Sequence, residues 1–162
     1  MIARGDLARM RERHILDSLR AAVAVPPGAR VVLDLGSGAG LPGVPLAIAR
    51  PGLRVILAES RHQRIAFLEL VARDLRLANV SVHAGRAEDA PHPVDACLAR
   101  AFRNASDSWT IARSLLSDDG CLLYYAGARF DEAHDIPEGS VAQLVPPPPL
   151  ANAGPLVIMT RQ

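Results

Sequence analysis

The chain has 162 residues, of which 49% are hydrophobic, and this size and composition fit a single domain with a buried core. Its formal net charge at pH 7 is +1, which excludes a surface that is basic throughout, so any contact with nucleic acid has to come from a local patch. The chain contains no lysine, and its 18 positively charged side chains are therefore all arginines, which can bind phosphate through two parallel hydrogen bonds.

Helical and strand patterns alternate along most of the chain. Hydrophobic residues recur at helical spacing in four segments, and each predicts an amphipathic helix: 6–24, about 41–50, 61–77 and a segment capped by Asn104 or Ser106. Short apolar runs between turn residues predict five buried strands, the last of which follows a turn at 118–120: 30–35, 54–59, 80–84, 94–99 and 121–125. This alternation predicts a parallel sheet with helices on both faces.

The C-terminal part does not follow the alternation. Two strand-like segments, 141–145 and 155–160, flank a stiff run of prolines, and together they predict a hairpin over about 140–161. Such a hairpin would add an antiparallel strand to the sheet. The fold class predicted for residues 1–162 is therefore a single α/β domain with a mostly parallel, doubly wound, Rossmann-like sheet, whose core lies within about 30–127.

The most informative segment is a glycine-rich loop directly after the first strand. The strand ends in Asp34-Leu35, and Gly36, Gly38 and Gly40 follow at every second position. Glycine adopts positive φ and has no Cβ, so these residues permit a sharp turn and the close approach of a ligand to the backbone. A helix begins next, near Pro42, and its first N–H groups lack helical partners and are available to a ligand. The loop predicts a nucleotide-cofactor site within the core rather than a plain turn.

Two acids bear on which cofactor binds there. Residues 38–43 satisfy G-x-G-x-x-G, the dinucleotide pattern, which is not specific on its own. Glu59 closes the second strand about 20 residues further on, where its carboxylate would bind the ribose hydroxyls of either NAD or S-adenosylmethionine. Asp34 favours one of these cofactors over the other. An acid beside the first glycine suits the cationic amino-acid end of S-adenosylmethionine and repels the pyrophosphate of NAD. S-adenosylmethionine is the favoured cofactor, and NAD is the alternative.

Other candidate residues follow the remaining strands, because ligands of open α/β sheets bind at the carboxyl ends of the strands. Residues 85–89 are interpreted either as an adenine-binding turn or as a polar turn that caps a short helix. Arg100 is favoured as a ligand or phosphate contact over a structural ion pair, and Phe102 is expected to belong to the core rather than to form a platform on which a base stacks. His14 and Asp17 share one face of the first helix, where a solvated local hydrogen bond is the simplest interpretation.

Composition also predicts the state of the cysteines, whether a metal is bound and where the protein is located. Cys97 and Cys121 lie in apolar segments and are expected to be free, buried thiols rather than a disulfide. Two cysteines and scattered histidines do not make a zinc site, so no metal is expected. The charged start of the chain is unlike a signal peptide and no apolar run reaches transmembrane length, so we expect a cytoplasmic protein without membrane contact. The sequence does not reveal the oligomeric state, and a monomer is the default expectation.

Taken in order, these segments closely resemble the RsmG family, also called GidB, which comprises the 7-methylguanosine methyltransferases of bacterial small-subunit ribosomal RNA. The resemblance spans about residues 13–127 and rests on five segments: 13–19, 34–47, 61–70, 86–89 and 100–102. The Gly-Leu-Pro-Gly-x-Pro-Leu sequence at 40–46 is far more specific than a generic glycine loop.

The resemblance implies a class I methyltransferase fold that uses S-adenosylmethionine and methylates N7 of a guanine in the 530 loop of 16S ribosomal RNA, in the small ribosomal subunit. By position it implies cofactor contacts from Gly36, Leu41, Ala87, Glu88 and Arg100. With the residues argued above, the expected cofactor-binding set is Asp34, Gly36, Gly38, Gly40, Leu41, Glu59, Ala87, Glu88 and Arg100. N7 carries a lone pair and no proton, so no general base is needed; His14, Asp17 and Arg100 are candidates to hold the RNA or the methionine end of the cofactor.

Two features depart from the family's pattern. RsmG-like chains usually carry a longer N-terminal helical extension, and they usually have a lysine where this chain has Ala126. Both departures would weaken contact with RNA more than contact with the cofactor, unless arginines such as Arg103 and Arg129 substitute. Two alternatives therefore stand beside an active RNA methyltransferase: a non-catalytic module that binds S-adenosylmethionine and RNA or the ribosome, and a methyltransferase with a different substrate.

Overall fold

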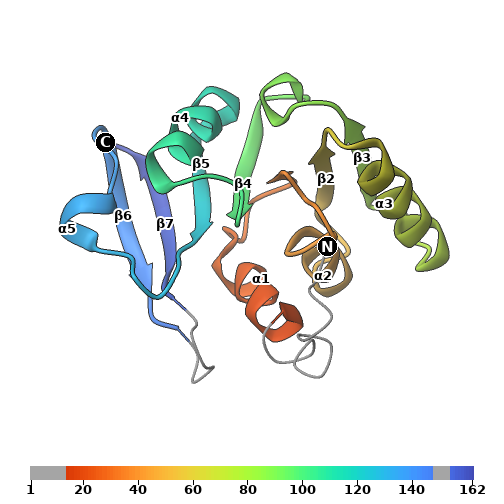
Figure 1. Cartoon of the computed structure of the whole chain (residues 1–162), viewed down its shortest axis with the longest axis horizontal. Helices are drawn as coiled ribbons and strands as arrows, with labels where there is room; N and C mark the ends of the chain where they lie inside the picture. Colours follow the sequence, from red (N-terminus) through yellow and green to blue (C-terminus); the bar gives the residue numbers. More distant parts are fainter. Residues whose placement is uncertain (1–13, 148–153) are drawn as a thin grey trace.

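One seven-stranded sheet forms the centre of the protein (Figure 1). The computed structural model of the chain describes residues 14–147 and 154–162. The strands are β1 (Val31–Leu35), β2 (Arg54–Glu59), β3 (Val80–Ala84), β4 (Val94–Arg100), β5 (Leu116–Tyr125), β6 (Ser140–Val145) and β7 (Leu156–Arg161). Their order is β3-β2-β1-β4-β5-β7-β6. The first five pair in parallel, and β7 runs antiparallel to both of its neighbours, which confirms the predicted fold class.

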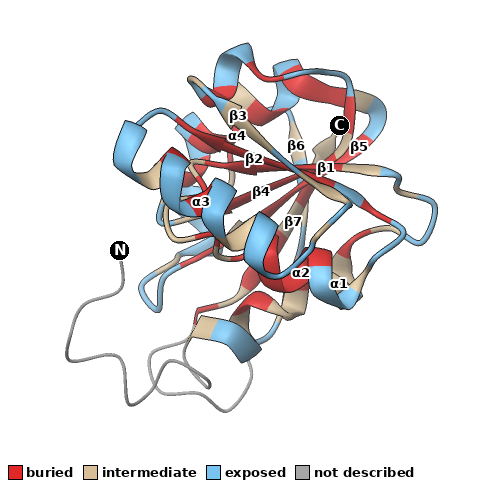
Figure 2. Ribbon diagram, turned by 90° about the vertical axis from the view of Figure 1, so that its right-hand side faces the viewer, coloured by how far each residue is buried: buried red, intermediate tan, exposed pale blue. Residues whose placement is uncertain are grey.

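Helices cover both faces of this sheet. They are α1 (Arg20–Ala24), α2 (Gly43–Ala49), α3 (His62–Asp74), the short 3-10 helix η3 (Ala87–Asp89), α4 (Ala105–Leu115) and α5 (Glu132–Asp135). On one face, Ala21, Leu46 and Leu68 from the first three helices are fully buried against the strands. On the other face, α4 buries Trp109 and Leu115. Figure 2 shows the buried residues along the strands and on the inward sides of the helices.

Local signals explain where several helices begin. The side chain of Asn104 accepts a hydrogen bond from the Asp107 N–H at 2.7 Å, which confirms Asn104 rather than Ser106 as the cap of α4. Helix α2 begins at Gly43, with Pro42 as its cap residue, two residues later than the start predicted near Leu41. Both starts lie at the carboxyl side of a parallel strand, so the cap residues also shape that edge of the sheet.

Two elements differ from the sequence prediction, and a third can be compared only in part. The turn predicted at 118–120 is wrong: Leu116 pairs with Val94 and Cys121 with Ala96, so 117–120 form an irregularity within β5. Helix α5 was not predicted. The first helix, expected over 6–24, can be compared only from His14 onward, because its earlier residues lie outside the described residues.

The two cysteines are free and buried, as predicted. They lie on the neighbouring strands β4 and β5, but Cys97 packs in the cluster on one face of the sheet and Cys121 in the cluster on the other. Burial raises the pKa of the Cys97 thiol well above its ordinary value and that of Cys121 to about 11. Both side chains therefore act as small apolar core residues in the protonated form.

Candidate functional site

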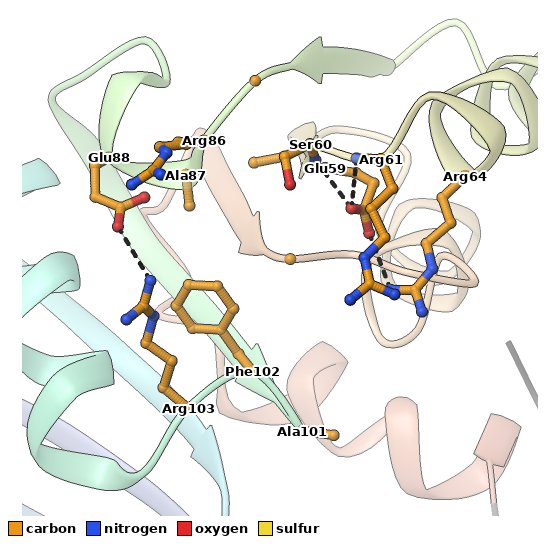
Figure 3. A pocket seen from close by; sticks show the side chains of 13 residues that line it. Glu59, Ser60, Arg61, Arg64, Arg86, Ala87, Glu88, Ala101, Phe102 and Arg103 are labelled. Atoms are coloured by element: carbon orange, nitrogen blue, oxygen red, sulfur yellow. Dashed lines mark hydrogen bonds and ion pairs between the residues drawn. The ribbon is translucent and has the colours of Figure 1, made fainter.

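A pocket of about 380 Å³ lies at the edge of the sheet where β1, β2, β3 and β4 have their carboxyl ends (Figure 3). Parallel strands end at the same edge, so the segments that follow them converge there although they are far apart in sequence. The lining residues are Gly36, 58–61, Arg64, 85–88 and 101–103. Four of the residues predicted to contact a cofactor therefore share one pocket: Gly36, Glu59, Ala87 and Glu88.

The glycine loop has the backbone geometry that its sequence predicts. The φ angles of Gly36, Gly38 and Gly40 are +66°, +57° and +82°, in the region that favours glycine. The Gly40 N–H donates to the Ser37 carbonyl at 2.8 Å, which tightens the turn. A Cβ placed on Gly36 would lie 2.6 Å from Cδ2 of Phe102, so this position has no room for a side chain.

Asp34 lies beneath the loop rather than in the pocket. Its side chain is 1% exposed, and Oδ2 accepts a hydrogen bond from the Gly43 N–H at 3.1 Å. Burial raises the pKa of Asp34 to about 7, although the Gly43 N–H and the charge of Arg100 act in the opposite direction. Asp34 thus joins the end of β1 to the start of α2, and in this geometry it supports the loop without facing a ligand.

Replacing Asp34 with asparagine is expected to change the pH dependence of stability. The pKa of Asp34 in the folded protein is about 7, above the value of about 3.9 for an unfolded aspartate, so the proton stabilises the fold. This stabilisation is complete below the unfolded pKa and is lost as pH rises through about 7. Relative to Asp34→Asn, the wild type should lose roughly 2–3 kcal/mol of unfolding free energy between pH 5 and pH 8. Urea unfolding at both pH values measures the difference in unfolding free energy between the wild type and Asp34→Asn. The same difference at pH 5 and pH 8 would contradict the prediction.

Glu59 closes β2 and is almost completely buried, with 5% of its side chain exposed. Its Oε1 accepts from the N–H groups of Ser60 and Arg61 at 2.9 and 3.0 Å, and its Oε2 accepts from the Gly38 N–H at 3.1 Å. Burial alone would raise the pKa of Glu59, but these hydrogen bonds and the Arg64 guanidinium at 3.5 Å outweigh it and lower the pKa. Glu59 is therefore an ionised carboxylate that also fixes the glycine loop.

The segment after β3 includes a short helix, as one of its two sequence interpretations expects, and adenine binding stays a prediction. It forms the short helix η3, and its residues Gly85 to Glu88 also line the pocket. Ala87 is buried, whereas the Glu88 carboxylate reaches across to the Arg103 guanidinium at 3.5 Å. Figure 3 shows this ion pair between the segments that follow β3 and β4.

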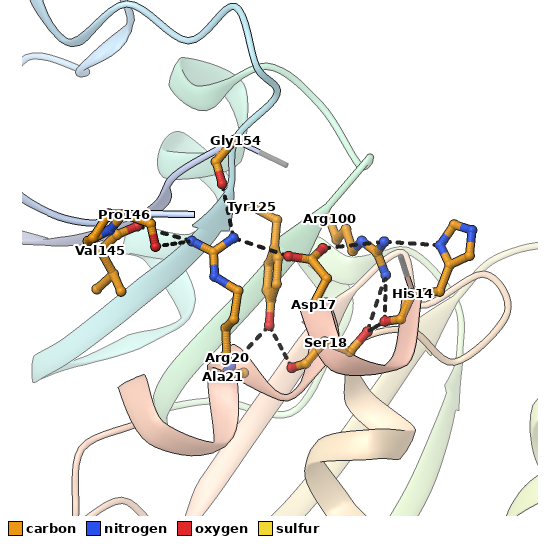
Figure 4. A network of polar contacts seen from close by, with 10 residues as sticks. All are labelled: His14, Asp17, Ser18, Arg20, Ala21, Arg100, Tyr125, Val145, Pro146 and Gly154. Atoms are coloured by element: carbon orange, nitrogen blue, oxygen red, sulfur yellow. Dashed lines mark hydrogen bonds and ion pairs between the residues drawn. The ribbon is translucent and has the colours of Figure 1, made fainter. Parts of the chain in front are cut away.

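The structure brings His14, Asp17 and Arg100 together, but outside the pocket (Figure 4). Arg100 ends β4, and its Nη1 donates to the Ser18 hydroxyl at 3.2 Å. Its Nη2 lies 3.1 Å from Nδ1 of His14 and 3.4 Å from the Asp17 carboxylate. Asp17 is only 14% exposed, so it does not lie on the solvated face that the sequence suggested. Arg100 thus connects the strand edge to the segment before α1.

Tyr125 and Arg20 extend this network to the C-terminal strands. The Tyr125 hydroxyl donates to the Ser18 carbonyl at 2.8 Å and accepts from the Ala21 N–H at 3.1 Å. The Arg20 guanidinium donates to the carbonyls of Val145 and Gly154, both at 3.0 Å, and therefore joins α1 to β6 and β7. These contacts are made by residues that are far apart in sequence, so they stabilise the tertiary fold.

Replacing Tyr125 with phenylalanine is expected to destabilise the protein. The change leaves the buried Ala21 N–H and the Ser18 carbonyl without this partner, which should cost about 1–3 kcal/mol and lower Tm by several degrees. Tyr124→Phe is the matched control, because the Tyr124 hydroxyl makes only an exposed hydrogen bond of 3.3 Å to the Arg103 carbonyl. Equal Tm values for the two variants would show that the buried network contributes nothing.

The pocket also contains side chains that the sequence did not assign to the cofactor. One is Phe102, which is expected in the core. The others are arginines at or near the strand ends: Arg61, Arg64, Arg86 and Arg103. Of these, Arg103 is one of the arginines expected to substitute for the missing lysine. Their positions after β2, β3 and β4 were a usable signal, because ligands bind at these strand ends. They form a local basic patch on a chain whose net charge is +1. Ala126 is buried and does not line the pocket.

Three other predicted cofactor residues lie at different places around the loop. Gly38 contacts Glu59, Gly40 is buried within the loop, and Leu41 lines a separate apolar groove beside α2 and α3. Within 14–147 and 154–162 there is no group of three or more histidine, cysteine or acidic residues placed to hold a metal ion. Among the helices of that same part of the chain, none is long and apolar enough to cross a membrane.

Comparison with protein families gives a consistent match. A family model described as rRNA small subunit methyltransferase G matches residues 1–140. The protein of Herminiimonas arsenicoxydans named ribosomal RNA small subunit methyltransferase G is 43% identical over 141 residues, which is 83% of this chain and 64% of the relative. The protein of the same name from Burkholderia mallei is 39% identical over 150 residues, which is 86% of this chain and 65% of the relative. The chain thus spans just under two thirds of the length of these relatives.

Comparison with solved structures supports the fold. The S-adenosylmethionine-dependent methyltransferase SibL superposes with a TM-score of 0.72 at 18% identity, covering 98% of this chain and 57% of SibL. A variant of MtNAS crystallised with S-adenosylmethionine superposes with a TM-score of 0.70 at 20% identity, covering 91% of this chain and 61% of MtNAS. These neighbours share the class I methyltransferase fold with this chain.

Proposed function

Because the chain belongs to the rRNA small subunit methyltransferase G family, we propose that it transfers a methyl group from S-adenosylmethionine to N7 of a guanine in 16S ribosomal RNA. The observation that carries the proposal is the pocket in which the glycine loop, Glu59 and the Ala87–Glu88 turn converge at the carboxyl ends of the strands. The partner that this reaction requires is the small ribosomal subunit or its RNA, which implies a place in the cytoplasm.

The residues of the pocket fit S-adenosylmethionine. Gly36 lines the pocket without a side chain of its own, so the loop presents backbone rather than a side chain to this part of the pocket. Glu59 is ionised and could accept from the ribose hydroxyls; its contact with Arg64 at 3.5 Å is its longest, and a hydroxyl would most easily replace it. Ala87 and Glu88 offer a backbone N–H and a carboxylate to an adenine edge. When bound, the cofactor supplies an electrophilic methyl group on a sulfonium ion.

The chemistry of N7 explains why the pocket needs no general base. N7 of guanine carries a lone pair and no proton, so the side chains have no proton to remove. Their task is to align the base and to stabilise the positive charge that develops on it. His14, Asp17 and Arg100 hold one another outside the pocket, so we assign them to positioning the strand edge rather than to a chemical step. The arginines that line the pocket are the groups available to RNA phosphates: Arg61, Arg64, Arg86 and Arg103.

Methyl transfer in a purified system tests the proposal. The protein is incubated with S-adenosylmethionine labelled in its methyl group and with small ribosomal subunits from a bacterium that lacks its own methyltransferase G. Label is expected in 16S RNA, as 7-methylguanosine. Cofactor binding without any transfer would instead favour a non-catalytic binding module, and label in another base would favour a different substrate.

A further inference from the structure

A left-handed residue turns the chain into the pocket directly after β4. Ala101 has a φ of +51°, which alanine rarely adopts because its Cβ crowds the backbone. Non-glycine residues of this kind cost about 1 kcal/mol or more and cluster at functional sites. The turn separates two neighbours: Arg100 points toward the segment before α1, whereas Phe102 points into the pocket (Figures 3 and 4). The strained backbone therefore serves to place the Phe102 ring.

The Phe102 ring contacts the backbone of the glycine loop and a stacked cation. A Cβ on Gly36 would lie 2.6 Å from Cδ2 and 3.1 Å from Cε2 of the ring, so the ring covers the first glycine of the loop. The guanidinium carbon of Arg103 lies 5.4 Å from the ring centroid, in cation–π contact. Arg103 is 46% exposed and also pairs with Glu88, so this planar cation can leave the ring without losing a buried partner.

In the strand order, Phe102 follows the strand that lies beside the glycine loop. In the order β3-β2-β1-β4, Ala87 and Glu88 follow β3, Glu59 closes β2 and the glycine loop follows β1. Those segments would hold the cofactor, and Phe102, which follows β4, would lie next to it on the side of the glycine loop away from β2. An aromatic ring in this place can stack on a planar base, as aromatic side chains do in RNA recognition.

We propose that Phe102 is the stacking platform for the target guanine and that the guanidinium of Arg103 occupies the place of the base until RNA binds. This rests on the proposed function and adds the residue that positions its substrate. Guanine methylated at N7 is a cation, and the ring already holds a cation at its face. The Phe102 ring therefore stabilises the charge that develops on the base during transfer, and Arg103, once displaced, is free to contact a phosphate.

Three substitutions at one position test the proposal. Phe102→Leu keeps an apolar side chain without a ring, Phe102→Ala removes both, and Phe102→Tyr keeps the ring. With small ribosomal subunits as substrate, Leu and Ala are expected to lower kcat/KM about tenfold or more, whereas Tyr stays within about threefold of the wild type. The Kd for S-adenosylmethionine, measured by calorimetry, is expected to change by less than about threefold in all of them. Wild-type kcat/KM in Phe102→Leu would overturn the proposal, as would an equal loss of cofactor binding.

A fluorescence experiment tests the stacking platform independently of the proposed function. The chain has a single tryptophan, the buried Trp109, so Phe102→Trp adds one indole to a known background. With S-adenosylhomocysteine bound, 7-methylguanosine monophosphate is expected to quench the new emission saturably, and adenosine monophosphate much less. No quenching would overturn the platform even if methylation occurs. A wild type that does not methylate would overturn the proposed function, while quenching would still report a guanine-stacking site.

Discussion

Replacing Gly36 with valine is expected to abolish binding of S-adenosylmethionine. The backbone at this position has a φ of +66°, which a β-branched residue does not tolerate. A Cβ there would also lie 2.6 Å from the Phe102 ring, so the loop or the ring must move, and either movement closes the space next to the backbone. Calorimetry should show an affinity for S-adenosylmethionine reduced by about 100-fold or more.

A matched glycine controls for the substitution itself. Gly28 lies in a turn, has nothing within 4 Å of a built Cβ and does not have a positive φ, so Gly28→Val should bind the cofactor like the wild type. Thermal unfolding of both variants shows whether Gly36→Val still folds. A folded Gly36→Val protein that binds S-adenosylmethionine with wild-type affinity would place the cofactor elsewhere.

The second large effect is expected for Glu59→Gln. The carboxylate accepts hydrogen bonds from three backbone N–H groups, those of Gly38, Ser60 and Arg61, whereas an amide has one oxygen and would turn an NH₂ group toward one of these donors. The variant therefore loses both the ionised acceptor proposed for the ribose and part of the support of the loop. Affinity for S-adenosylmethionine should fall about 10- to 100-fold, in line with the loss of charged hydrogen bonds in a buried site.

Glu69 provides the control for this change. It lies on α3, is exposed, and is absent from the pocket lining, so Glu69→Gln should leave binding unchanged. The expected loss should also persist from pH 6 to pH 9, because the pKa of Glu59 is lowered and the group is ionised throughout this range. Binding that is insensitive to Glu59→Gln would remove Glu59 from the cofactor site.

The sequence is sufficient to predict the parts of this protein that depend on local pattern. Strand positions followed from short apolar runs, and the positive φ angles followed from the spacing of Gly36, Gly38 and Gly40. The convergence of Glu59 and Ala87 with the loop followed from one rule, that ligands bind where parallel strands end. These features require only residues that are close in sequence or elements whose order is regular.

The directions of side chains required the tertiary structure. Arg100 ends β4 and Phe102 follows it, and the sequence favours Arg100 for the ligand and Phe102 for the core. The left-handed Ala101 between them sends the two side chains in different directions: Phe102 packs against the buried core, as expected, and also lines the pocket, whereas Arg100 joins the network around Asp17. Asp34 was similarly expected beside the ligand, but its hydrogen bond to the Gly43 N–H turns it beneath the loop.

The most direct measurement of the central claim is mass spectrometry of 16S ribosomal RNA from cells with and without this gene. The nucleoside 7-methylguanosine is expected in the RNA of cells that carry the gene and not in the RNA of cells from which it has been deleted. Returning the wild-type gene should restore the modification, and returning the Gly36→Val gene should not. An unchanged amount of 7-methylguanosine after deletion would contradict the assignment of this chain as a guanine-N7 methyltransferase of the small ribosomal subunit.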